Sequence, residues 1–356
     1  MTERSVESWI ALSLIPGLGP ELTRRLLAAF GDPDRALSGS VASLSPVVGP
    51  AVARAIAGGP DPARIAAATV WLADPANGIV TLADEDYPRL LLETPDPPPV
   101  LYLKGRRELL NAPGLAIVGS RSATPQGVEN ALSFAQALAE SGLAIVSGLA
   151  RGIDAAAHRG GLAGRGSTVA VVGTGLDVVY PAANRALAHE ISRGGLLVGE
   201  FPLGTPAIAG NFPRRNRLIS GLARGVLVVE AALKSGSLIT ARLALEQGRD
   251  VFAIPGSIHS PLSKGCHRLI KQGAKLVESA QDVLEELGWA AAPSSPAEPE
   301  AVGHPLLEYL GFDPVGMDTL ADRCGLPPEQ VSAALLELEL QGVVASLPGG
   351  KVQRLR

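Results

Sequence analysis

The feature that most constrains the fold is a regular alternation of two sequence patterns between residues 113 and 288. Short runs rich in β-branched residues alternate with Ala-rich stretches of helical periodicity. The runs are LAIVG (115–119), LAIVSG (143–148), TVAVVG (168–173), LLVGE (196–200), GVLVVE (225–230) and DVFAIPG (250–256). Near-continuous apolar runs are typical of parallel strands buried on both faces. The alternation therefore predicts an α/β fold with a doubly wound, mostly parallel sheet.

The ends of these predicted strands carry residue types that bind anions. In an open α/β sheet, ligands bind outside the carboxyl ends of the strands. Glycine lets a ligand approach the backbone, serine and threonine hydroxyls and helix N-termini bind phosphate oxygens, and arginine or lysine neutralises charge. The segments in these positions are 119–121, 147–154, 173–177, 211–217 and 234–237. The residues alone therefore predict a phosphate-rich ligand at this edge of the sheet.

Two common phosphate fingerprints are missing from these segments. Gly173-Thr174-Gly175 is followed by Val178 where the third glycine of a dinucleotide-binding turn belongs, and Gly119-Ser120-Arg121 lacks the initial pair of glycines. No GxxxxGK[ST] sequence follows the first predicted strand. A nicotinamide or ATP enzyme is therefore disfavoured, and no cofactor is expected.

Positive charge is concentrated in one part of an acidic chain. The whole chain carries a formal charge of −4, whereas residues 201–277 contain eleven basic and three acidic residues. This segment is therefore +8 and the remainder −12. Such an asymmetry favours a local anion site, the alternative being a solvated basic surface.

The densest basic motif is NFPRRNR, residues 211–217. If its end is helical, Arg214 and Arg217 lie on neighbouring faces and Arg215 projects elsewhere. We expect at least one of these arginines to face the anion and one to be structural. Phe212 combines an aromatic ring with neighbouring cations, as in sites that stack a base while holding its phosphate. The alternative for Phe212 is a buried core position.

The chain is flanked by two further regions of different character. Residues 1–75 are Ala/Leu-rich with helical periodicity, and 15–31 and, more weakly, 45–59 have the form of a helix-hairpin-helix turn. Such turns either present N–H groups to a phosphate or simply connect helices. The carboxylate of Glu21 at the start of the second helix would repel phosphate.

The C-terminal region reads as a linker followed by a winged helix. Residues 290–304 are rich in Ala, Pro, Ser and Glu, and 305–356 read as three helices and a hairpin with Pro-Gly-Gly at its tip. The helix that would enter the major groove, 327–341, contains Glu329, Glu337 and Glu339 and neither lysine nor arginine. We therefore expect this domain to bind protein or regulate the main domain, and not to read duplex DNA.

Several other classes of protein are disfavoured. No stretch of about 18 apolar residues occurs, so no membrane-spanning helix is expected, and the N-terminus lacks the apolar run of a signal peptide. The two cysteines, Cys266 and Cys324, form no CxxC motif and favour a reducing, cytoplasmic location. His259, Cys266 and His267 lack a metal-site spacing, so no metal is predicted.

The motifs at the strand ends, taken together, resemble those of the DprA/Smf family, the DNA-processing proteins of bacterial natural transformation. The resemblance covers nearly the whole chain, and the number and order of the motifs make it specific. The motifs are GSR (119–121), SGLARGIDAAAH (147–158), GTGLDVVYPAAN (173–184), NFPRRNRLISGL (211–222), KSGSLITA (234–241), GRDVFAIPG (248–256) and the stretch 263–274.

The resemblance implies a domain organisation. It implies an all-α, SAM-like domain with helix-hairpin-helix turns over 1–75, an extended Rossmann-like domain over 76–289, a linker over 290–304 and a winged-helix domain over 305–356. The Rossmann-like domain would bind single-stranded DNA and form a homodimer through residues 266–276. The family usually has Asn where this chain has His267.

The resemblance also implies a role. The protein would bind incoming single strands without strong sequence preference, protect them and help load the RecA recombinase during natural transformation (competence) and homologous recombination. The implied partners are single-stranded DNA, RecA, a second copy of the chain and single-strand-binding protein, with no membrane. No catalytic activity and no catalytic residue are implied.

Site residues follow from the resemblance position by position. Arg121 and Lys234 would hold backbone phosphates, and Arg217 would line the same basic pocket. Phe212 would stack on or wedge between bases. The complete set of predicted DNA-binding residues is Gly119, Ser120, Arg121, Phe212, Arg215, Asn216, Arg217, Lys234, Ser235, Gly236 and Ser237.

Two other functions remain as alternatives. Rossmann-like phosphoribohydrolases also process nucleotides at strand ends, and Glu200, Glu230 or Asp177 would then be the general acid or nucleophile. Their PGGxGTxxE loop is replaced here by KSGSLITA, with Thr240 and Ala241 where glutamates are needed. A pure interaction scaffold would leave the basic cluster without a role.

Overall fold

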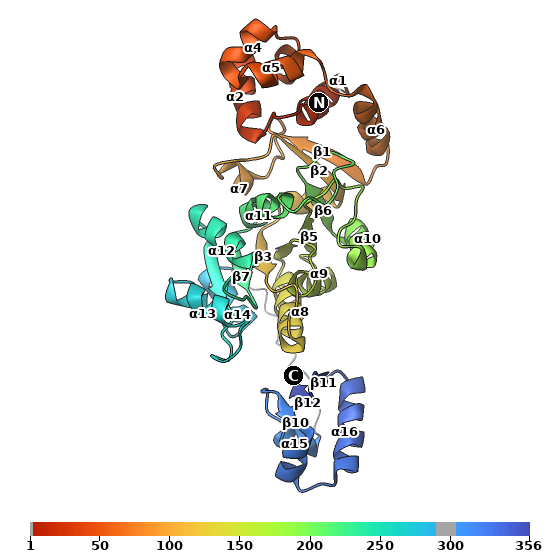
Figure 1. Cartoon of the computed structure of the whole chain (residues 1–356), viewed down its shortest axis with the longest axis vertical. Coiled ribbons are helices and arrows are strands. Elements are labelled where there is room, and N and C mark those ends of the chain that lie inside the picture. Colours follow the sequence, from red (N-terminus) through yellow and green to blue (C-terminus); the bar gives the residue numbers. More distant parts are fainter. Residues whose placement is uncertain (1–2, 290–303) are drawn as a thin grey trace. The chain divides into compact units, whose positions relative to one another are not determined.

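The computed structural model describes residues 3–289 and 304–356, and most of its helices and strands are labelled in Figure 1. The chain forms two compact units: the described residues of Met1–Ser122 with Ala131–Ala290, and those of Ala123–Asn130 with Ala291–Arg356. Except for its last residue, the linker predicted over 290–304 lies outside the described residues. The domain boundaries stay predictions. Among the described helices, none has the length and apolarity that a bilayer crossing requires.

A nine-stranded sheet forms the centre of the first unit, in the order β1-β2-β6-β5-β4-β3-β7-β8-β9. All six predicted strands are present, and they pair with one another in parallel. They are β3 (Gly114–Val118), β4 (Ala144–Ser147), β5 (Thr168–Val171), β6 (Leu196–Gly199), β7 (Gly225–Val228) and β8 (Asp250–Ala253). The doubly wound, mostly parallel fold is therefore confirmed.

Three edge strands extend the predicted sheet. β1 (Asn77–Thr81) pairs with β2 (Val100–Gly105) in an antiparallel arrangement. β2 in turn pairs with β6, also antiparallel. β9 (Lys275–Leu276) pairs with β8 in parallel. The sequence analysis did not predict these strands. β9 is only two residues long, and β1 and β2 lie outside the region of strand–helix alternation.

Helices cover both faces of the sheet because alternate strand residues point to opposite sides. Val169 and Val171 of β5 join one apolar cluster, which also contains residues of α11 (Asn211–Gly221) and α12 (Ser237–Glu246). Ala170 joins the other cluster, with residues of α9 (Ile153–Ala163), α10 (Arg185–Gly194) and α1 (Glu3–Leu14). The remaining elements of this unit after β1 are α7 (Arg89–Leu92), η1 (Arg107–Asn111), η2 (Ala182–Asn184), α13 (Lys264–Lys271), α14 (Ala280–Glu286) and, from Ala131 onward, α8 (Pro125–Glu140).

The strand order reverses between β3 and β7. From β3 the chain adds β4, β5 and β6 on one side, and then returns to add β7 and β8 on the other. The connections that leave β3 and β7 therefore diverge, which opens a crevice at the carboxyl ends of these two strands. The fold itself thus selects this point as the ligand site.

The N-terminal region is helical, as predicted. After α1 come α2 (Pro20–Phe30), α3 (Pro33–Leu37), α4 (Val41–Val48), α5 (Pro50–Ala57) and α6 (Pro62–Leu72). Both predicted hairpin turns are present: Gly17 and Gly49 have φ of +79° and +81°, which favours glycine, and the following helices begin with proline. Trp9 and Ile10 of α1 pack in one cluster with Tyr102 of the sheet.

The C-terminal unit contains the predicted winged helix. The elements of residues 304–356 are η3 (Pro305–Glu308), β10 (Val315–Gly316), α15 (Met317–Cys324), α16 (Pro328–Leu340), β11 (Val344–Leu347) and β12 (Lys351–Arg354). The three strands form one sheet in the order β10-β12-β11, and the β11–β12 hairpin confirms the predicted wing. Leu320 of α15 and Val331 and Leu335 of α16 share one buried core.

Candidate nucleic-acid interface

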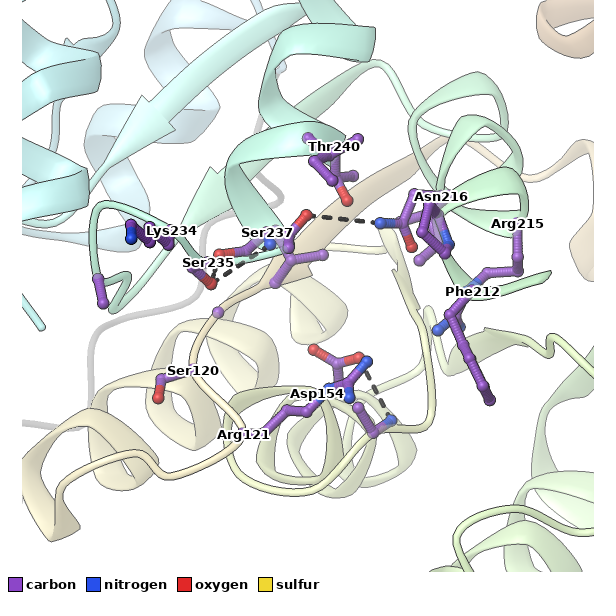
Figure 2. A pocket seen from close by; sticks show the side chains of 18 of the residues that line it. Ser120, Arg121, Asp154, Phe212, Arg215, Asn216, Lys234, Ser235, Ser237 and Thr240 are labelled. Atoms are coloured by element: carbon purple, nitrogen blue, oxygen red, sulfur yellow. Dashed lines mark hydrogen bonds between the residues drawn. The ribbon is translucent and has the colours of Figure 1, made fainter. Parts of the chain in front are cut away.

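A cavity of about 490 Å³ lies at the switch point between β3 and β7. Figure 2 shows Lys234 and Phe212 at its opposite ends, with Arg121 and Asp154 between them. The lining residues are 118–122, Ala150, Asp154, Phe212, Pro213, Arg215, Asn216, Ile219, Ala232, 234–237, Ile239 and Thr240. These residues come from four loops and helices far apart in the sequence, and the sheet brings them to one edge.

One end of the cavity is built around the start of α12. Lys234 is exposed, and Ser237 is the first residue of the ten-residue helix. The Ser235 and Ser237 hydroxyl oxygens lie 2.7 Å apart. Hydroxyls, a lysine and the positive end of a helix dipole all favour an anion. The N–H groups of Ser237, Leu238 and Ile239 already donate to Ser235 and Gly236, so the hydroxyls and Lys234 are the groups that can reach a ligand. Asn216 of α11 donates to the Gly236 carbonyl at 3.5 Å and so links α11 to this turn.

The turn after β3 presents Arg121 to the same cavity. Gly119 is required because a Cβ atom there would lie 2.6 Å from Cγ1 of Ile153. Gly152, with φ of +71°, faces the Ser120 carbonyl so closely that no Cβ fits. The close contact of these two loops positions Arg121, which is exposed. Within residues 3–289 and 304–356, neither Arg121 nor Lys234 forms an ion pair.

Phe212 forms the other end of the cavity as part of an aromatic cluster. Its ring packs against Gly173, where a Cβ atom would lie 3.0 Å from Cδ1 of Phe212. The Arg121 guanidinium lies 5.9 Å from the centre of the ring, and the Tyr180 ring lies 5.3 Å from it. Because Phe212 is half-buried, it is neither a free surface residue nor the fully buried core residue of the alternative interpretation.

Arg215 lines the floor of the cavity but is tied to the protein. Its side chain is buried, and its Nη1 donates to the carbonyl oxygens of Gly148, at 2.5 Å, and Val171. Burial lowers the pKa of Arg215 to about 10, and the charge of Asp154 opposes this shift. Burial also raises the pKa of Asp154, and Arg215 opposes that shift. The guanidinium therefore joins the ends of β4 and β5, and its charge favours the charged form of the buried Asp154 carboxyl.

The loop after β4 is held by two buried polar side chains. His158 Nε2 accepts from the Leu149 N–H at 3.2 Å, and its Nδ1 lies 2.7 Å from the Thr168 hydroxyl. Since that hydroxyl donates to the Ile145 carbonyl, Nδ1 carries the proton and the ring is neutral. Burial lowers the pKa of His158 to about 3, in agreement with this state. Asn184 donates to the carbonyls of Leu149 and Ala150.

Arg217 does not line the cavity, and the prediction that it shares the pocket with Arg121 and Lys234 is wrong. Its guanidinium pairs with the buried carboxylate of Glu200 and with Asp96, 3.5 Å from Nε. Arg214 also pairs with Glu200, at 3.2 Å. Burial raises the pKa of Glu200, and these two arginines oppose the rise. The exposed Arg214 and the half-buried Arg217 are thus neutralised by carboxylates from other loops.

Ten of the eleven predicted site residues line the cavity, and Arg217 is the exception. Their contact with DNA stays a prediction. Asp154 and Tyr180 were not predicted as parts of the site. Asp154 lies in the motif 147–158 and Tyr180 in the motif 173–184. Nothing in these motifs shows that Asp154 lies close to Arg215 or that Tyr180 contacts Phe212.

Most of the chain matches two known family models. Residues 78–288 match the family described as DNA recombination-mediator protein A. The chain belongs to this DprA/Smf family. Residues 290–350 match the DprA winged-helix domain.

Relatives of known sequence and structure agree with this membership. Protein Smf of Escherichia coli is 47% identical over 298 residues, 80% of this chain and 79% of the relative. The X-ray structure of DNA processing protein A from Streptococcus pneumoniae matches with 40% identity and a TM-score of 0.69, covering 80% of this chain and 98% of that one. DNA processing protein A from Helicobacter pylori, studied for its single-stranded DNA binding mode, matches with 33% identity and a TM-score of 0.54, covering 59% and 95%.

The segment expected to form the dimer, residues 266–276, lies in α13 and β9 of this DprA/Smf chain. Cys266 is buried, and burial raises its pKa to about 12. His267 Nε2 lies 3.0 Å from the Gly256 carbonyl oxygen, so it donates to that oxygen when protonated there. Leu276 of the edge strand β9 is 43% exposed. In the part of the chain that the structure describes, no cluster of His, Cys, Asp and Glu is suited to a metal ion.

Proposed function

We propose that the protein binds single-stranded DNA without strong sequence preference and helps to load RecA recombinase onto it. One observation carries this proposal: Arg121 and Lys234, which form no ion pair in the part of the chain that the structure describes, share one open cavity with the start of α12 and the aromatic ring of Phe212. Cations and the positive end of a helix dipole suit backbone phosphates, and an aromatic ring suits an unstacked base. The single-strand binding of the Helicobacter pylori relative supports the same ligand.

Weak sequence preference follows from the kinds of contact available. The cations and amide groups of the cavity suit phosphate oxygens, which are the same for every nucleotide. Stacking on Phe212 is open to any base, because every base has a π-face. Sequence reading would need donors and acceptors aimed at base edges, and Asn216, the one amide in the lining, donates to Gly236 instead.

The alternative, a nucleotide hydrolase, is less well supported by the carboxylates. Asp154 is the one carboxylate among the lining residues described, and it faces Arg215. Glu200 is paired with two arginines. Both carboxylate oxygens of Asp177 accept from the Gly204 N–H at 2.9 Å. A nucleophile or general acid must reach the substrate, so these positions favour a binding protein over an enzyme.

The protein partners belong to the same proposal. We propose a homodimer formed through α13 and β9, where Arg268, Lys271 and Leu276 are exposed while Cys266 and Leu269 are buried within the subunit. RecA and single-strand-binding protein are proposed partners because the family is described as recombination mediators. The cytoplasm, where RecA acts on DNA, is the proposed location.

Salt dependence of DNA binding tests the proposed function. Labelled oligo-dT is expected to bind at low salt, and its affinity to fall steeply as salt rises. A single strand gives a log–log slope of about −0.7 per phosphate contacted, so contacts by Arg121 and Lys234 predict a slope of about −1.4 or steeper. The measurement is fluorescence anisotropy over a salt series. Absence of binding at low salt, or hydrolysis of AMP by the purified protein, would contradict the proposal.

Deletion of residues 300–356 tests the role of the winged helix. On α16, the helix expected to enter a major groove, Glu329 and Glu337 are exposed and no lysine or arginine is present. Its approach to DNA phosphates is therefore repulsive. Oligo-dT affinity is expected to change by no more than a few-fold, as measured by anisotropy. A loss above about a hundredfold, or 2.8 kcal/mol, would show that this domain contributes directly to single-strand binding.

A further inference from the structure

Tyr180 extends the aromatic surface beyond the cavity. Its side chain is 48% exposed, and its ring lies 5.3 Å from the Phe212 ring with an angle of 40° between the planes. It does not belong to the cavity lining, whereas Phe212 does. The Phe212 ring also contacts the Arg121 guanidinium. A series of planar groups therefore begins inside the cavity and continues onto the surface.

The other tyrosines show why this position needs an explanation. Tyr87 and Tyr102 are buried, and their hydroxyls are bonded to the Pro98 carbonyl and to Ser13. Tyr309, in the winged helix, is 44% exposed, but it forms no ring pair among the described residues. A single exposed aromatic residue is ordinary. What distinguishes Tyr180 is that it pairs with an aromatic residue of the proposed DNA site.

The loop that carries Tyr180 is fixed on both sides. Before it, the Thr174 hydroxyl donates to the Val178 carbonyl at 2.7 Å. After it, the Asn184 N–H donates to the Pro181 carbonyl at 3.0 Å, and the Asn184 side chain donates to the loop after β4. A ring held on such a loop loses little conformational freedom when a base stacks on it. The geometry suits recognition better than a freely moving tyrosine would.

We propose that Tyr180 is a second base-stacking position, and that a single strand leaves the cavity over Phe212 and places its next base on Tyr180. This inference rests on the proposed function. It assigns phosphate binding to the Lys234 and Arg121 side and stacking of two neighbouring bases to the Phe212–Tyr180 pair. Duplex DNA does not fit this surface, because its base faces are already covered by stacking.

Photochemical crosslinking tests this placement directly. Oligo-dT in which one thymine at a time is replaced by 5-iodouracil is bound to the full chain, irradiated and analysed by mass spectrometry. A crosslink to Tyr180 is expected from one position of the iodouracil, and a crosslink to Phe212 from a neighbouring position. Crosslinks to Phe212 without any to Tyr180 would overturn the inference and leave the proposed function intact. Failure of wild type to bind oligo-dT would instead count against the proposed function.

Three substitutions of Tyr180 distinguish two roles: stacking on a base, and packing against Phe212 without contacting DNA. Tyr180→Ala is expected to weaken oligo-dT binding about tenfold, with an unchanged salt slope because no phosphate contact is lost. Tyr180→Phe is expected to bind like wild type. Tyr180→Leu can still pack against Phe212 but offers no planar ring, so it is expected to bind as weakly as Tyr180→Ala. Wild-type affinity for Tyr180→Leu would show that Tyr180 only supports Phe212.

Two controls accompany these variants. Tyr309→Ala removes a tyrosine of similar exposure outside the first unit and is expected to leave oligo-dT affinity unchanged. Thermal unfolding of each Tyr180 variant is compared with that of wild type. Equal losses of affinity for Tyr309→Ala and Tyr180→Ala would overturn the inference, because the loss would not then depend on contact with Phe212.

Discussion

Replacement of Arg121 and Lys234 together by alanine is expected to weaken oligo-dT binding about a thousandfold at low salt. A hydrogen bond to a charged group contributes about 1.5–3 kcal/mol, and each 1.4 kcal/mol is a factor of ten, so two lost contacts account for this range. The two side chains project into one cavity from the loops after β3 and β7 and form no ion pair in the part of the chain described. Their removal therefore takes charge from the ligand and breaks no ion pair among the described residues. Anisotropy with labelled oligo-dT measures the loss.

The same double variant is expected to flatten the salt dependence. Each lost phosphate contact reduces the log–log slope by about 0.7, so the slope becomes shallower by about 1.4. Arg165→Ala is the matched control, because it removes one exposed positive charge from the loop before β5, at the opposite edge of the sheet. It is expected to change affinity and slope little. A loss of less than tenfold in the double variant, or an equal loss in the control, would place the DNA elsewhere.

Arg215→Ala is expected to destabilise the first unit by about 3–5 kcal/mol, the typical cost of leaving a buried charge uncompensated. The substitution leaves Asp154 buried without its counter-charge and removes the donor to the Gly148 and Val171 carbonyls. Urea unfolding followed by tryptophan fluorescence measures the effect. The three tryptophans, Trp9, Trp71 and Trp289, all lie in the first unit, so the signal reports on that unit.

A second variant keeps this prediction informative if Arg215→Ala unfolds. Arg215→Ala combined with Asp154→Ala removes the uncompensated carboxylate, so it is expected to recover part of the stability lost in the single variant. The opposite result, a stable Arg215→Ala protein that no longer binds oligo-dT, would make Arg215 a DNA contact, as the sequence analysis predicted. The structure favours the stabilising role, because the guanidinium already has two carbonyl acceptors within the protein.

The arginines of the NFPRRNR motif mark the limit of what could be predicted. The sequence indicated that one arginine is structural and one faces the anion, but it did not show which. The structure directs Arg214 and Arg217 to Glu200, and Arg215 to Gly148 and Val171. Arg121, from the loop after β3, remains without a carboxylate partner among the described residues. Ion-pair partners that come from distant loops leave no mark on the local pattern.

What the sequence alone determined was the class of fold and the edge where the ligand site lies, because burial periodicity and strand-end chemistry are local properties that one short segment records. The tertiary structure decided which cations stay free to meet a ligand. Arg217 contacts Asp96, which lies 121 residues earlier in the chain. Tyr180 contacts Phe212 although β6 lies between them in the sequence. Such contacts depend on how the sheet orders its strands, and this order follows from the packing of the whole domain and not from any single motif.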